Sequence, residues 1–251
     1  MTSFADHFSG RAREYARYRP DYPESLFEFL ADQAPDRARA WDCATGSGQA
    51  ALGLAGRFGS VLATDASVNQ VSNAARHPRV RYAVATAEEA PLPEGSVALV
   101  AAAQALHWFD RDRFWAEARR VLVSGGLLAV WSYRGFHVIP EVEAVVHRFY
   151  KDIVGPYWPP ERVLVERGYD DLKFPFEPLT PPTFTLEKLW DLPAVLGYLK
   201  TWSATQRYEA ALGCDPLLLI RGDLEAAWGP PQKVRRFRWD LDLRVGRNAN
   251  G

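Results

Sequence analysis

The chain has 251 residues, 47% of them hydrophobic, and a formal net charge of −1 at pH 7. This length supports a sizeable core in one large domain, and the near-zero charge gives no electrostatic argument for a nucleic-acid partner or an acidic membrane. Cys43 and Cys214 cannot make a disulfide framework, and no segment approaches the roughly 20 apolar residues of a membrane span. These features predict a reduced, cytoplasmic protein.

The first 22 residues form an arm that is rich in aromatic and arginine side chains. Composition alone favours a solvated basic helix whose rings pack against the domain. Pro23 then opens a helix whose apolar face contains Leu26, Phe27 and Leu30. The main core is expected to begin after this helix, at residue 36.

A short buried strand, a tight turn and the start of an amphipathic helix follow over residues 40–51. Gly46 and Gly48 lack Cβ atoms, so their backbone can take positive φ and approach a ligand closely. The next apolar run ends in Asp65, at the tip of a second strand, where a carboxylate can accept hydrogen bonds from ribose hydroxyls. NAD and S-adenosylmethionine (SAM) both satisfy this pattern, because both carry a ribose with free hydroxyls.

Strands and helices alternate over the middle of the chain. The strand over residues 97–102 is nearly all apolar, as expected when both faces of a sheet are covered. Ser67 and Asp110 are suited to cap the two helices that flank it. This alternation predicts a right-handed doubly wound sheet, with helices at 68–76 and 111–121 and further strands at 80–84 and 127–131.

The last hundred residues change in character. We expect a helix near 141–154, a loop-rich lid, and a strand at 174–179. Residues 185–212 are expected to be mostly helical, with a break at Pro193. Apolar and charged residues then alternate from Arg236 to Val245, which predicts a half-buried strand.

Asp42 closes the first strand, where dinucleotide folds usually keep an apolar residue. The pattern Asp42-x-x-x-Gly46-x-Gly48 resembles motif I of the class I SAM-dependent methyltransferases, although Ala44 stands at the usual first glycine of that family. Three further stretches, at residues 15–23, 103–110 and 202–206, resemble small-molecule methyltransferases related to trans-aconitate methyltransferase and the quinone-biosynthesis C-methyltransferases. The resemblance spans nearly the whole chain.

This resemblance implies a single class I methyltransferase domain over residues 1–251. Its fold is an α/β, Rossmann-like, doubly wound sheet of seven strands, with the last strand antiparallel. An N-terminal arm and first helix (1–35) precede the SAM-binding core (36–131). A helical and loop-rich lid (132–173) and a C-terminal part that completes the sheet (174–251) follow.

The resemblance also implies SAM as the cofactor and an arm that folds over it, with Arg19 as the partner of the methionine carboxylate. Thr86 replaces an acidic residue that the family often has beside the adenine, so the backbone and Glu88 are expected to take over that contact. The predicted cofactor-binding residues are Tyr15, Tyr18, Arg19, Asp42, Ala44, Thr45, Gly46, Gly48, Asp65, Ala66, Thr86, Ala87, Glu88, Ala103 and Gln104.

The predicted function is methyl transfer to a small-molecule acceptor, with a carboxylate suggested by the resemblance and Arg134 or Arg207 as its clamp. His107 is either a general base with an ordinary pKa near 6.5 or part of the surface against the cofactor. The five histidines show no metal-ligand spacing. We expect two or three of six aromatic residues to line the pocket: Trp108, Trp131, Tyr157, Trp158, Trp202 and Tyr208.

Two alternatives remain open at this point. A nicotinamide-dependent oxidoreductase would use the same glycine turn, but Asp42 and the absence of a second mononucleotide half count against it. A non-catalytic SAM-binding or partner-binding domain is the other, because Ala44 and Thr86 depart from the family pattern. The acceptor, its nucleophilic atom and the oligomeric state are not determined by the sequence.

Overall fold

The computed structural model describes residues 18–249. Within them, eight strands are joined in one sheet, in which β3-β2-β1-β4-β5-β8-β6 form a continuous path and β7 pairs with β8 outside it. The strands are β1 (Arg39–Cys43), β2 (Ser60–Asp65), β3 (Val80–Val84), β4 (Val97–Ala103), β5 (Leu122–Tyr133), β6 (Glu177–Leu179), β7 (Thr185–Trp190) and β8 (Arg235–Arg247). The doubly wound path of seven strands, with β8 antiparallel to β5, confirms the predicted fold class.

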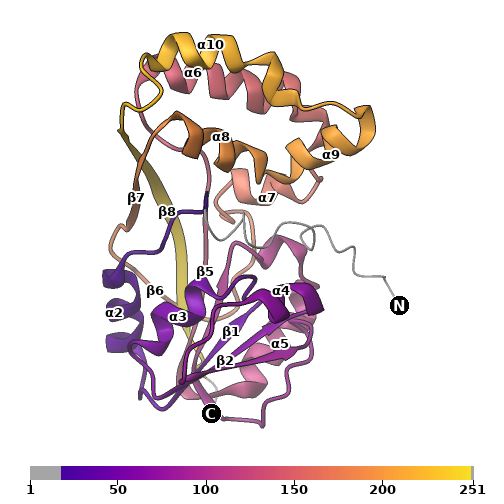
Figure 1. The fold of residues 1–251 in the computed structure, drawn as a ribbon. Helices are drawn as coiled ribbons and strands as arrows, with labels where there is room; N and C mark the ends of the chain where they lie inside the picture. Colours follow the sequence, from indigo (N-terminus) through magenta and orange to yellow (C-terminus); the bar gives the residue numbers. More distant parts are fainter. Residues whose placement is uncertain (1–17, 250–251) are drawn as a thin grey trace.

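Helices cover both faces of the parallel part of this sheet (Figure 1). Alternate residues of β1 face opposite sides: Ala40 packs with the apolar residues of α2 (Glu24–Gln33) and α3 (Gln49–Ala55), whereas Trp41 packs with those of α5 (Arg111–Val121). The strand β4 is apolar throughout because it is buried on both faces. A short helix, α4 (Val68–Asn73), follows β2 and is capped by Ser67, as predicted.

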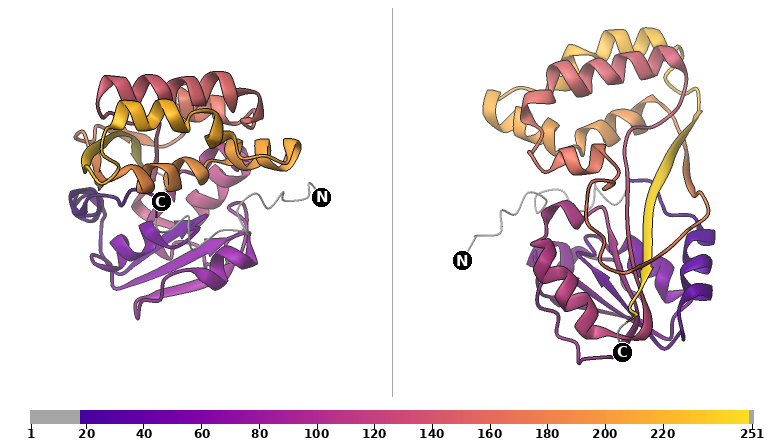
Figure 2. Two further views of the ribbon diagram at one scale, coloured as in Figure 1. Left: turned by 45° about the horizontal axis from the view of Figure 1, so that its top comes forward. Right: turned by 180° about the vertical axis from the view of Figure 1, so that it is seen from behind.

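A second helical layer lies above the carboxyl ends of the parallel strands (Figures 1 and 2). We call this layer the cap. It is built from two separate segments, one before β6 and one after β7, so that both segments close over the same edge of the sheet. The first segment contains α6 (Pro140–Arg148), the π-helix η2 (Phe149–Ile153), η3 (Gly155–Tyr157) and α7 (Arg162–Glu166). The second contains α8 (Leu192–Lys200), α9 (Ser203–Leu212), η4 (Pro216–Leu219) and α10 (Arg221–Trp228).

Two predictions for the C-terminal third are wrong. Residues 185–190 form the strand β7 instead of a helix, because they pair antiparallel with residues 235–240, the first half of β8, in which apolar and charged residues alternate. Pro193 does not break a helix but lies in the first turn of α8, behind the Asp191 N-cap, where a missing N–H is harmless. The strand predicted at 174–179 is reduced to its last three residues, because only these pair with β8.

The long strand β8 explains why so many charged residues occur in a strand that belongs to the sheet. Its first half leaves the parallel layer and pairs with β7, so that Arg236, Arg238 and Asp240 face solvent while Phe237 and Trp239 are buried. Its second half enters the main sheet beside β5. No helix within residues 18–249 is long and apolar enough to cross a membrane.

Candidate functional site

The turn between β1 and α3 places backbone groups at the carboxyl edge of the sheet. Gly46 and Gly48 have φ values of 55° and 89°, which are left-handed conformations that glycine adopts readily. Ala44 has φ 55°, so this residue adopts the same kind of backbone conformation despite its Cβ. The left-handed conformation that the family's glycine would favour is therefore present, and the substitution adds strain and a methyl group.

Asp65, the last residue of β2, is hydrogen-bonded to this turn. Its two carboxylate oxygens accept backbone N–H groups from Gly46 and Ser67, each at 2.9 Å. The Asp65 residue is buried, with 8% of its surface exposed. Asp65 therefore holds the glycine turn in place at the tip of β2, where the sequence predicts the ribose of the cofactor.

We expect Asp65→Ala to lower SAM affinity about tenfold to a hundredfold, because hydrogen bonds to a charged group contribute roughly 1.5–3 kcal/mol. The variant also leaves the Gly46 and Ser67 amides without their acceptor, so its free energy of unfolding should fall. Calorimetry measures the affinity, and Asp65→Asn is the control that keeps one acceptor oxygen but loses the charge. An Asp65→Ala protein that is folded and binds SAM with wild-type affinity would contradict the assignment.

Asp42 closes β1 and is completely buried. One oxygen accepts the Thr45 hydroxyl at 2.5 Å, whereas Oδ1 has no hydrogen-bond partner among the described residues. Burial, which dominates, raises the pKa of Asp42 to about 7. The parallel strands β1 and β4 are neighbours, and the strand order reverses between them, which is where open α/β sheets bind ligands. A buried carboxyl oxygen without a partner at this point fits a ligand that carries a positive charge, as SAM does.

The other predicted cofactor residues follow the same edge. They lie at the ends of three parallel strands: Ala66 after β2, a loop after β3, and Ala103 with Gln104 at the end of β4, which β1 separates from β2. In the β3 loop, Thr86 is exposed, Ala87 is buried, and Glu88 accepts the Asp110 amide at 3.0 Å. The sheet order therefore brings this set together, while contact with SAM stays a prediction for each residue.

The N-terminal arm enters the described structure only at its end. Tyr15 lies outside the described residues. The Tyr18 ring lies against Gly197 of α8, where a Cβ would come within 2.5 Å of the ring. Arg19 donates to Tyr133 Oη at 3.5 Å and to the Thr201 carbonyl at 3.3 Å, so this part of the arm runs under the cap.

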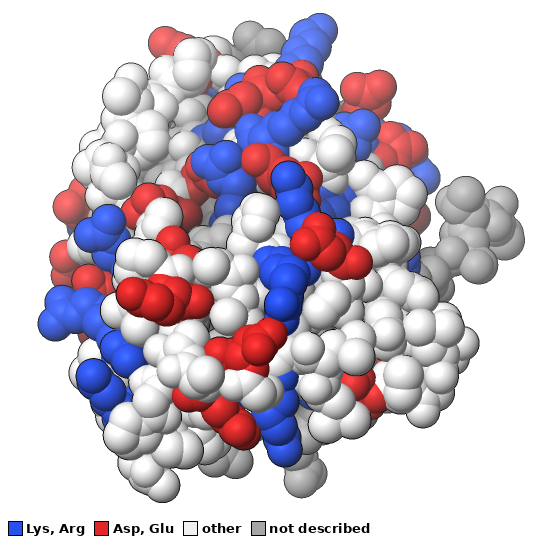
Figure 3. Space-filling model, turned by 90° about the horizontal axis from the view of Figure 1, so that it is seen from above, with Lys and Arg blue, Asp and Glu red and all other residues white. Residues whose placement is uncertain are grey.

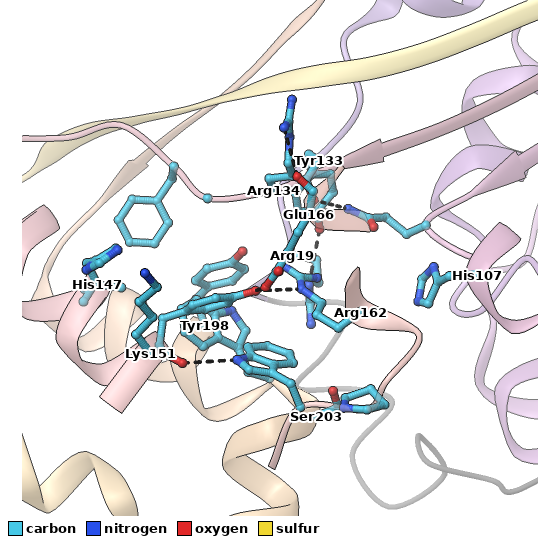
Figure 4. Close-up of a pocket in the computed structure, with 18 of the residues that line it drawn as sticks. Arg19, His107, Tyr133, Arg134, His147, Lys151, Arg162, Glu166, Tyr198 and Ser203 are labelled. Atoms are coloured by element: carbon cyan, nitrogen blue, oxygen red, sulfur yellow. Dashed lines mark hydrogen bonds between the residues drawn. The ribbon is translucent and has the colours of Figure 1, made fainter. Parts of the chain in front are cut away.

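A cavity of about 580 Å³ opens between the cap and the carboxyl end of β4 (Figure 4). Gln104 and His107 line it from the sheet side, and Tyr198 lines it from α8. The π-helix η2 contributes Tyr150 and Lys151 to the wall, and irregular helical turns of this kind occur often at functional sites. Three of the six aromatic residues singled out from the sequence line the cavity: Trp108, Trp158 and Trp202.

The cavity wall carries an excess of positive charge. Among the described residues that line it, four are Lys or Arg (Arg19, Arg134, Lys151, Arg162) and two are acidic (Glu143, Glu166). The outer face of the cap is different, because basic and acidic side chains are intermixed across the surface seen in Figure 3. The positive excess therefore belongs to the cavity and not to that outer surface.

Arg162 is one of these cations, and its guanidinium is held in a defined orientation by aromatic neighbours. Its Nε donates to Tyr150 Oη at 3.0 Å, and its guanidinium lies over the Trp158 ring at 4.7 Å. Among the described residues it makes no ion pair within 4.0 Å, so its terminal N–H groups are left to face the cavity. Arg162 was not predicted from the sequence as a site residue. Its only sequence signal is that it follows Pro159-Pro160 in a segment rich in aromatic residues.

The two arginines that the sequence analysis proposed as a clamp have different positions. Arg134 lines the cavity, but its guanidinium is already bound to Asp242 at 2.7 Å and to the Glu166 carbonyl at 3.1 Å. Arg207 is not among the residues that line the cavity. Arg162 is therefore better placed than either to receive an anionic group.

His107 lies on η1 (Leu106–Trp108), directly after β4, and is 9% exposed. Burial, together with the nearby charge of Arg162, lowers the pKa of His107 to about 3. The ordinary pKa near 6.5 expected from the sequence is wrong for this site. His107 is neutral at physiological pH and too weakly basic to explain an acidic limb near pH 6.5.

Three non-glycine residues within 18–249 have positive φ: Ala44, Gln104 and Tyr169. Ala44 lies in the glycine turn and Gln104 on the cavity wall, while the Tyr169 hydroxyl bonds to His107. Left-handed conformations cost free energy for residues with a Cβ and persist only where the surroundings enforce them. Their position around one edge of the sheet marks that edge as the functional one.

Comparisons with known proteins show the family to which the chain belongs. A family model described as a methyltransferase domain matches residues 41–130. A candidate methyltransferase of Dictyostelium discoideum is 35% identical over 231 residues, which cover 90% of this chain and 88% of that protein. A solved structure of a candidate type II methyltransferase from Anaeromyxobacter dehalogenans has a TM-score of 0.87 and 49% identity, and covers 93% of this chain and 100% of that one.

A malonyl-[acyl-carrier protein] O-methyltransferase of Geobacter sulfurreducens is 35% identical over 124 residues, which are 46% of this chain and 46% of that protein.

The chain belongs to the class I SAM-dependent methyltransferases and contains a type 11 methyltransferase domain. It is a methyltransferase, and its cofactor is SAM. The nicotinamide and non-catalytic alternatives are therefore set aside.

Proposed function

We propose that this enzyme transfers the methyl group of SAM to a small carboxylic acid that binds in the cavity below the cap. The acceptor carboxylate lies between the tip of β4 and Arg162, and the carboxylate oxygen is the nucleophile. The observation that carries the proposal is Arg162, a guanidinium held between two aromatic rings on the cavity wall with no carboxylate partner among the described residues.

Arginine suits this task because its planar donors match the two oxygens of a carboxylate. The stacking on Trp158 and the bond to Tyr150 Oη fix the guanidinium plane before an acceptor arrives. Tyr150 in turn donates to the Glu166 carboxylate, so the tyrosine is itself held. An arginine oriented in advance loses less side-chain entropy on binding, which favours affinity and a fixed approach direction.

When bound, SAM would supply a methyl group on a positively charged sulfur. The acceptor oxygen would form a bond to the methyl carbon while the C–S bond breaks and its electron pair stays on sulfur, which leaves as a neutral thioether. The protein's part is to hold the two reactants in line and to exclude water under the cap. A carboxylate is ionised at pH 7 and needs no base. The low pKa of His107, about 3, agrees with a site that does not rely on proton removal.

The Geobacter relative provides separate support, since its name states that it methylates oxygen on a malonyl group. The aromatic wall formed by Trp158, Trp202 and Tyr198 suits an acceptor with an apolar body behind its carboxylate. These features favour small carboxylic acids with a hydrophobic or unsaturated portion. This is the same general acceptor class that the resemblance to trans-aconitate methyltransferase relatives suggests.

The experiment is a panel of small carboxylic acids, each paired with its primary amide as a neutral isostere, with S-adenosylhomocysteine release as the readout. We expect turnover with some of the acids and none with the matching amides. Base hydrolysis of the product should regenerate the acid, because the product is a methyl ester. Equal turnover of an acid and its amide, or a product that resists hydrolysis, would contradict the proposal.

A further inference from the structure

The buried pair formed by His107 and Tyr169 has no assigned role in the reaction. Tyr169 Oη lies 2.9 Å from His107 Nδ1, and the tyrosine is 1% exposed. Tyr169 does not line the cavity, whereas His107 does. Nδ1 is bonded to the buried tyrosine, so Nε2 is the ring nitrogen that is left for a contact with a molecule in the cavity.

Tyr169 has a strained backbone conformation, and hydrogen bonds to two neighbouring segments hold it there. It has φ 63°, an outlier for a bulky side chain. Its amide donates to the Leu164 carbonyl at 3.0 Å, and its own carbonyl accepts Arg244 Nη1 of β8 at 2.6 Å. A strained residue that its neighbours fix from both sides indicates that the position of its side chain matters.

The direction of the hydrogen bond follows from the number of protons available. The Tyr169 hydroxyl has one proton, and His107 Nδ1 is the acceptor that lies in hydrogen-bond geometry. If Nδ1–H donated instead, the buried phenol proton would need another acceptor. Ser132 is the alternative: its hydroxyl has no bond of normal geometry among the described residues, yet it lies near enough to lower the Tyr169 pKa.

We infer that Tyr169 is a positioning residue, whose hydroxyl donates to His107 Nδ1 and holds the imidazole in the tautomer that presents Nε2–H to the acceptor. His107 then acts as a neutral hydrogen-bond donor to an acceptor oxygen and not as a base. This inference rests on the proposed function only in placing the acceptor in the cavity. His107 would then make a second contact with the acceptor, in addition to that of Arg162, and this contact would distinguish oxygen-bearing acceptors from apolar ones.

Nitrogen NMR of the resting enzyme, labelled with ¹⁵N in its histidines, tests the tautomer without any acceptor. The His107 signals are assigned by their loss in His107→Gln. We expect Nε2 to carry the proton and Nδ1 to be unprotonated in the wild type, and Ser132→Ala to leave that pattern unchanged. A wild-type spectrum with the proton on Nδ1 overturns the inference, whether or not any Tyr169 variant folds.

Tyr169→Phe removes the hydroxyl alone. We expect its His107 signals to become those of a mixture of tautomers, the KM of the acceptor to rise about tenfold, and the dissociation constant of SAM to stay within about twofold. A Tyr169→Phe protein with the wild-type spectrum overturns the inference. Absence of turnover with every carboxylic acid would refute the proposed function, whereas the spectrum of the resting enzyme would still decide the tautomer.

Discussion

The free energy of unfolding of the SAM-free enzyme should fall by about 3 kcal/mol between pH 4 and pH 7 through Asp42 alone. The folded protein holds the Asp42 proton until a pKa of about 7, whereas the unfolded chain releases it near 3.8. Between these values the folded state binds more protons, so stability decreases as pH rises. Each unit of pKa difference corresponds to about 1.36 kcal/mol, and the decline levels off about one pH unit above the folded pKa, where Asp42 is ionised in both states.

Denaturant unfolding at a series of pH values measures this contribution. Asp42→Asn is the matched control, because an amide cannot ionise and the contribution of Asp42 should disappear. S-adenosylhomocysteine should also reduce the decline, since a cationic amino group near the carboxyl oxygen that lacks a partner would favour the ionised form. If wild type and Asp42→Asn show the same pH dependence, the carboxyl group is not the cause.

Arg162→Ala should raise the KM of a carboxylic acid acceptor on the order of a hundredfold. The reason is the loss of charge-assisted hydrogen bonds in a partly desolvated cavity, each worth about 1.5–3 kcal/mol. SAM affinity should change little, because all the predicted cofactor residues except Arg19 and Gln104 lie outside the described cavity lining, and Arg162 is not one of the predicted cofactor residues. Steady-state kinetics and calorimetry measure the two quantities separately.

Two further variants make the Arg162 test specific. Arg162→Lys keeps the charge but not the planar donors, so it should recover only part of the lost affinity. Arg148→Ala removes an exposed arginine of α6 that pairs with Asp223 and does not line the cavity, and its kinetics should match the wild type. An acceptor KM that does not change in Arg162→Ala would exclude Arg162 as the carboxylate partner.

The sequence by itself was sufficient for the parallel part of the sheet and for the edge at which the predicted cofactor residues lie. The glycine turn, Asp42 and Asp65 belong to local patterns, in which each strand end and helix start can be recognised from a few neighbouring residues. Parallel strands bring their carboxyl ends to one edge, so the predicted residues had to meet there. The same local approach failed at β7, because strand pairing with β8 overrides the helix predicted there.

The acceptor side of the site was decided by the tertiary structure. Arg19, His107 and Arg162 line one cavity although they are far apart in the chain, and only the closure of the cap over β4 brings them together. The pKa of His107 is low because burial penalises its charged form, and no sequence pattern shows which side chains become buried there. Motifs predict contacts within one turn or strand, whereas the charge, protonation and direction of a side chain depend on neighbours that folding alone supplies.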